Sequence, residues 1–237
     1  MVSTTGPTKY RSDKDTLKGD GSDGLSQNSM TIETMARIPD FVHAPRTHLS
    51  EIQDLYRRAC LDVEEFTTRK AEISQQLFEG KYASFAKRAV VTERIIPLCH
   101  TAHGMLLTIT LGCNTILAAL HPWDTTLADD NARFCDDVLL LSQQVSQYRP
   151  LGASHLPLCL VAAYLAVADP VKRETLHSLL EDYQGDFTGA LWVIVAEGAR
   201  KTYMDARLRI FQEIEHDLGE EVDRPSDVED VSLCGVQ

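Results

Sequence analysis

Apolar residues recur at three- and four-residue steps along much of this chain, which is the spacing of a helix with one buried face. The first long stretch begins near Ser50, where Ser50 and Gln53 have the spacing of a capping box. Gly80 is placed to end this helix, and a shorter helix is expected over about 82–92. The expected buried face of the first helix comprises Leu49, Ile52, Leu55, Tyr56, Ala59, Cys60, Val63 and Phe66.

The segment from Leu98 to Leu120 is apolar on nearly every side, interrupted by His100, His103 and Asn114. It is long enough to cross a bilayer. A helix at the centre of a bundle is also apolar all round. The two histidines, the asparagine and four threonines favour the centre of a bundle over a membrane helix.

Four further helices are expected downstream. They cover about 125–148, 156–168, Asp169-Pro170 to Tyr183, and a last long helix from a Thr188 cap to about Asp217. No segment of the chain shows sustained two-residue alternation of apolar and polar residues, so no strand is expected. Residues expected to face the core are Leu127, Phe134, Val138, Leu141, Val145, Leu191, Trp192, Val195, Tyr203, Ile210, Phe211 and Ile214.

The chain divides into one helical domain between two polar ends. Residues 1–30 are rich in Gly, Ser and Thr and hold few apolar groups, so they cannot offset the entropy of ordering. We expect a disordered arm over 1–47, and a single all-α bundle of about six to eight helices over 48–217. The acid-rich residues 218–237 are expected to form a flexible tail.

Composition argues against direct contact with nucleic acid. The 237 residues carry a formal charge of −12 and show no basic patch that could hold phosphate. The six cysteines form no C-x-x-C pair, which favours reduced thiols in a reducing compartment, the nucleus or cytoplasm. The start of the chain has the pattern neither of a signal peptide nor of a transit peptide.

His100 and His103 are the strongest candidates for chemistry, because two histidines three apart on a helix can converge. With Asn114 they would line a small-molecule pocket. The alternative is a pair of structural histidines in the core. No acidic third ligand follows at a usual spacing, so we predict neither a metal nor a cofactor, and no catalytic residue is assigned.

Two acid pairs, Asp129-Asp130 and Asp136-Asp137, lie seven residues apart and so share a helical face. Aspartate-rich helices can bind magnesium and a diphosphate. Asn131, Ala132 and Arg133 follow the first pair where that signature needs another acid, so a solvated face is the preferred interpretation.

Residues from about 98 to 212 resemble the C-terminal regulatory region of fungal zinc-cluster (Zn2Cys6) transcription factors. The motifs that carry the resemblance follow one another in order along the chain. They are the His100-to-Leu120 helix with His121-Pro122, Leu156-Pro157-Leu158 with Ala162 and Ala163, Asp169-Pro170 with Arg173, Leu179-Leu180, and Leu191-Trp192. Arg173 lies in a first helical turn, where the helix dipole does not favour it, so a carboxylate or carbonyl partner is expected.

The resemblance implies a regulatory or interaction domain that contacts transcription machinery, a full-length relative or a small effector. The cysteine-rich zinc cluster and its basic stretch are missing here, so zinc and DNA binding are not implied. An enzyme of fungal secondary metabolism that reuses the helical scaffold is the alternative, and an inactive paralogue is a third. Oligomeric state is open at this point.

Overall fold

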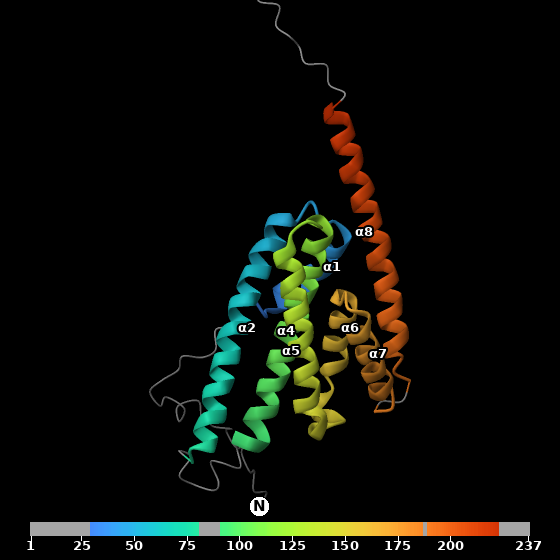
Figure 1. The fold of residues 1–237 in the computed structure, drawn as a ribbon. Helices are drawn as coiled ribbons and strands as arrows, with labels where there is room; N and C mark the ends of the chain where they lie inside the picture. Colours follow the sequence, from blue (N-terminus) through green and yellow to red (C-terminus); the bar gives the residue numbers. More distant parts are fainter. Residues whose placement is uncertain (1–28, 81–90, 187–188, 223–237) are drawn as a thin grey trace, which may run out of the picture.

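The structure is a computed structural model that describes residues 29–80, 91–186 and 189–222. These residues form seven α-helices and no strand, which confirms the predicted all-α bundle (Figure 1). Several predicted features lie wholly or mostly outside the described residues. They are the part of the N-terminal arm over residues 1–28, the helix expected near 82–92, the Thr188 cap and the tail from 223 onward. The helices are α1 (Ile32–His43), α2 (Leu49–Phe78), α4 (Ile96–Leu120), α5 (Thr125–Val145), α6 (Leu156–Ala166), α7 (Pro170–Gln184) and α8 (Trp192–Val222), with short turns η1 (Val91–Ile95), η2 (Ser146–Tyr148) and η3 (Leu151–Ala153).

Helix α4 is the central element, in contact with α2, α5, α6 and α8. The stretch Glu93–Leu120 is long and apolar enough to cross a membrane, but 72% of its most apolar window is buried inside the protein. Leu106, Leu107 and Leu111 are fully buried. The predicted position at the centre of the bundle is therefore confirmed, because neighbouring helices cover most of α4 and leave only a narrow face with Leu98 and Gly112 exposed.

Helix α2 buries the face that its sequence predicts, with Ile52, Leu55, Ala59, Val63 and Phe66 inside. Gly80, just after its end, has φ +68°, a conformation that suits glycine. The capping box at Ser50 is wrong: the helix begins at Leu49, and the residue before it, His48, makes no side-chain capping bond. The His48 ring is instead engaged with Glu51.

Helix α1 corrects the prediction of a disordered arm over residues 1–47, since residues 32–43 are helical. The Thr31 hydroxyl accepts a hydrogen bond from the Thr34 amide and caps the helix. Phe41 is only 4% exposed and packs with Ile52, Leu55 and other residues of the core. Burial of this ring, with Ile38 and Met30 packed against the same cluster, holds the short helix to the bundle.

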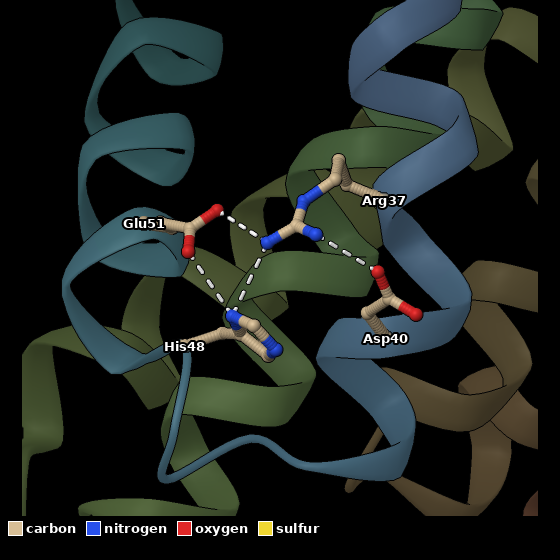
Figure 2. Close-up of polar contacts among 4 residues, drawn as sticks. All are labelled: Arg37, Asp40, His48 and Glu51. Atoms are coloured by element: carbon tan, nitrogen blue, oxygen red, sulfur yellow. Dashed lines mark hydrogen bonds and ion pairs between the residues drawn. The ribbon is translucent and has the colours of Figure 1, made fainter.

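An ion-pair cluster also joins α1 to α2 (Figure 2). Arg37 donates to Asp40 of its own helix at 2.9 Å and to Glu51 of α2 at 2.8 Å. The His48 Nδ1 atom lies 3.0 Å from Glu51 and 3.2 Å from Arg37. Hydrogen bonds from His48 and Arg37 lower the pKa of the Glu51 carboxyl. The side chains of the cluster are about half exposed, so its ion pairs add little to the free energy of unfolding. Their main effect is to set the orientation of α1 against α2.

Ahead of α1, Ser29 anchors the chain to the middle of α2. Its amide and its hydroxyl both donate to the Asp62 carboxylate, at 2.8 and 2.5 Å. Both residues are buried. A buried carboxylate needs such donors, so Asp62 fixes where the chain enters the bundle.

The C-terminal helices are held by polar contacts at their ends. The Asp169 side chain accepts from the Val171 amide and caps α7 as predicted. Arg173 donates to the carbonyl oxygens of Val167 and Ala168, which confirms a carbonyl partner. Arg149 pairs with Asp182 and Asp186 and lies over the Tyr183 ring, so the loop after α5 is clamped to α7.

The contact between α4 and α6 depends on Gly104, and this generates a testable prediction. A Cβ atom at this position would lie 2.7 Å from His155 Cδ2 and 2.9 Å from Cys159 Sγ. Both neighbours are buried, so Gly104→Ala is expected to lower the free energy of unfolding by about 1–3 kcal/mol. Urea titrations measure this change.

Gly112 of the same helix is the matched control, since nothing lies within 4 Å of its hypothetical Cβ. There Gly112→Ala should raise the free energy of unfolding by about 1 kcal/mol through helix propensity alone. Equal stability of the two variants would show that the helices do not approach as closely as described.

Candidate functional site

Three buried histidines gather at the N-terminal half of α4. His100 and His103 lie on α4, one turn apart, and His155 lies immediately before α6. Their exposed fractions are 5%, 6% and 7%. Sequence spacing predicted the first two, while His155 was missed because it is more than fifty residues away along the chain.

Aromatic rings and one hydroxyl hold the three imidazoles. His103 stacks on Phe66 of α2 with ring centroids 5.7 Å apart. His100 packs at a tilt against Tyr148 of η2, with centroids 5.9 Å apart. The His155 Nδ1 atom lies 3.4 Å from the Thr101 hydroxyl of α4. The site therefore depends on contacts between α2, α4 and the segment from η2 to the start of α6.

Several ring nitrogens of this histidine cluster have no hydrogen-bond partner within the described part of the chain. They are His100 Nδ1, both nitrogens of His103 and His155 Nε2. Buried polar atoms are normally satisfied. These nitrogens therefore have hydrogen-bonding capacity that no described residue uses.

The electrostatics of the cluster keep the rings neutral. The pKa of His100 and of His103 falls to about 4, because burial disfavours the charged ring and the Lys70 cation repels it. Burial also lowers the pKa of His155. Lys70 itself is half-buried and donates to Gln144 at 2.5 Å.

This arrangement limits the chemistry available to the cluster. A general base works best with a pKa near the working pH, so imidazoles with a pKa of about 4 are weak bases at neutral pH. Among the residues that the structure describes, no group of three or more His, Cys, Asp or Glu is placed to hold a metal ion. The geometry favours hydrogen bonding to a neutral polar group over proton transfer.

Asn114 does not belong to this cluster, which corrects the predicted grouping with His100 and His103. It lies eleven residues after His103, or about 16 Å along the helix axis. Its side-chain amide donates to the Tyr56 hydroxyl at 2.8 Å, and that hydroxyl donates to Asp130 at 2.6 Å. This chain of bonds joins α4, α2 and α5, so the role of Asn114 is structural.

The acid pairs of α5 are only partly a solvated face. Asp130 also accepts from Arg133, at 2.8 Å, besides Tyr56. Asp136 pairs with Lys172 of α7 at 2.5 Å. Each pair therefore contributes one carboxylate to tertiary contacts.

The start of α8 exposes apolar side chains where the sequence predicted core. Leu191, Ile194 and Val195 have exposed fractions of 55%, 61% and 48%. Ala196 and Ile210 are the buried residues of the described part of the helix. The prediction that Leu191 and Val195 face the core is wrong, because apolar residues lie on more than one side of α8 and spacing alone cannot choose between them.

The histidine cluster generates a prediction about pH. The unfolded rings have a pKa near 6.5, and the folded rings of His100 and His103 one of about 4. Between these values the unfolded state binds more protons, so stability falls as pH drops from 6.5 toward 4 and is unaffected above 7. Each histidine contributes about 1.4 kcal/mol per pH unit.

Urea unfolding of wild type and of His103→Leu at several pH values tests this expectation. The variant should show a slope smaller by one proton between pH 5 and 6. Leu141→Ala, which removes a buried non-titrating group, should be less stable but keep the wild-type slope. An unchanged slope in His103→Leu would contradict a neutral buried ring.

The chain was compared with family models, with curated proteins and with solved structures. None of the three comparisons gives a match.

Proposed function

We propose that this chain is a helical regulatory domain of transcription that acts through protein contacts, as the resemblance to fungal zinc-cluster factors implies. It lacks the cysteine-rich cluster with which those factors bind DNA. Its partner would be transcription machinery or a full-length relative bound to DNA, which implies a nuclear location.

The observation that carries the proposal is the apolar patch at the start of α8, defined as Leu191, Ile194 and Val195. All three side chains are about half exposed or more; Leu191 immediately precedes α8, and Ile194 and Val195 lie in its first turn. Grouped apolar residues on a surface mark sites of protein association. A side of α8 that the bundle does not cover is thus available to a partner.

Charge supports protein contact over nucleic-acid contact. The formal charge of −12 repels phosphate. Several cations are also used internally: Arg149 pairs with two aspartates, and Arg173 and Arg200 donate to backbone carbonyls. These groups hold the fold together.

A tethered reporter tests this function. The full chain, fused to a heterologous DNA-binding domain, is expected to change reporter transcription relative to that domain alone. Leu191→Glu with Ile194→Glu should return transcription to the baseline, because losing a hydrophobic hot spot costs about 2 kcal/mol of binding, roughly thirtyfold in affinity.

Leu151→Glu is the matched control, since Leu151 is 79% exposed and lies on η3, outside the patch. It should behave as wild type. A fusion without any effect on the reporter, or a patch variant as active as wild type, would contradict the proposal.

A second candidate, an enzyme or small-molecule binder of secondary metabolism, is favoured by the unpartnered nitrogens of the histidine cluster. Transcript and metabolite profiles of a deletion strain separate the two functions. Altered metabolites with unchanged transcripts, reproduced by His103→Leu, would support the second candidate. Altered transcripts would support the regulatory domain.

A further inference from the structure

Few side chains hold helix α1 to the bundle. Phe41 is its one residue described as buried, and Ile38 is partly buried against the same apolar cluster. Met30, just ahead of the helix, also packs there. Most other side chains of α1 are exposed, Val42 among them at 54%. Release of α1 therefore requires only one large side chain to leave the core.

Helix α1 is also weak on its own. Pro39 lies inside its 12 residues, and a proline has no amide hydrogen to donate to the carbonyl four residues earlier. A helix of this length is marginal in water even without a proline. Once separated from the bundle, α1 should therefore unfold and exchange its amide hydrogens with solvent.

The segment from Ser29 through α1 runs antiparallel to the N-terminal half of α2. Ser29 donates to Asp62, whereas Arg37, farther along the segment, donates to Glu51 near the start of α2 (Figure 2). Both carboxylates of α2 thus accept hydrogen bonds from this segment. Its departure would leave two acceptors on the side of α2 that the segment covers.

Between these acceptors, the Phe41 ring packs into an apolar cluster that α2 and α4 line. The other members from these two helices include Ile52, Leu55, Ile109, Cys113 and Leu117, each at most 3% exposed. Without Phe41 the cluster would lack the ring that completes its packing. Apolar side chains beside carboxylates form a site that suits an amphipathic helix with an aromatic anchor and a cation.

We infer that residues 29–43 form a latch that opens while the rest of the bundle stays folded, and that the site beneath it binds a helix of a partner protein. The partner helix carries an aromatic residue in the place of Phe41 and an arginine four positions earlier, in the place of Arg37. Its ring fills the apolar cluster, and its guanidinium pairs with Glu51. The latch is autoinhibitory, because α1 occupies the site with the same two groups.

This site is formed by α2 and α4 and is separate from the apolar patch of α8. The latch therefore does not depend on the proposed regulatory function. A negative reporter result would leave it standing, and absence of the latch would leave the reporter result unchanged.

Native-state hydrogen exchange of the full chain tests whether the latch opens by itself. Leu141→Ala truncates a buried side chain of a different core cluster, which opening of α1 leaves intact. Amides of α4 should then exchange roughly thirtyfold faster or more. Amides of α1 should keep wild-type rates, because their opening does not involve Leu141. Equal acceleration in α1 and α4 would show that α1 opens only with the whole bundle and would overturn the latch.

A labelled peptide of residues 29–43 tests the site beneath the latch, with fluorescence anisotropy as the readout. The full chain with Phe41→Ala should bind this peptide at least about tenfold tighter than wild type, since its own α1 no longer supplies the ring. Val42→Ala, a change at an exposed position of the same helix, should bind like wild type. A peptide that itself carries Phe41→Ala should bind neither chain.

Two results of the peptide experiment would contradict the inference. Equal affinity of wild type and the Phe41→Ala chain, or equal binding of the two peptides, would exclude a partner site for an aromatic anchor. Loss of amide protection throughout α4 in the Phe41→Ala chain would show that α1 is an integral part of the fold and not a latch.

Discussion

The fold depends on the burial of α4. This helix is apolar on nearly every side, so it is stable in water only when other helices surround it. Helices α2, α5, α6 and α8 all contact it. The close approach of α6 at Gly104 completes the enclosure, because a larger residue there would push His155 and Cys159 outward.

Enclosure forces the polar residues of α4 to find partners inside the protein. Asn114 does so through Tyr56 and Asp130, and this network ties three helices together. His100 and His103 are held mainly by aromatic contacts and keep unpartnered nitrogens within the described residues. The same constraint thus creates a structural network in which the Asn114 Oδ1 atom has no partner among the described residues, and a histidine site with several unpartnered ring nitrogens.

Helix α8 differs from α4 because the bundle covers only one of its sides. Tyr203 donates to the Thr115 carbonyl and Arg200 to the Tyr164 carbonyl, which fix this side on α4 and α6. Ile194, Met204 and Leu208 lie outside this covered side and are exposed. An acidic protein with such a helix is suited to contacts with other proteins, and the regulatory function proposed above uses a surface of α8 that the core leaves free.

The sequence by itself determined the helices of the core and most of their inward faces, because helical periodicity and capping are local properties. Leu127, Phe134 and Val138 are buried as the pattern of α5 predicts, and Asp169 caps α7. Only the tertiary structure decided which polar residues meet. It brought His155 to His100 and His103, separated Asn114 from them, ordered α1 through Phe41 and left Leu191 and Val195 exposed. These outcomes depend on contacts between segments far apart in the chain, and local spacing carries no information about them.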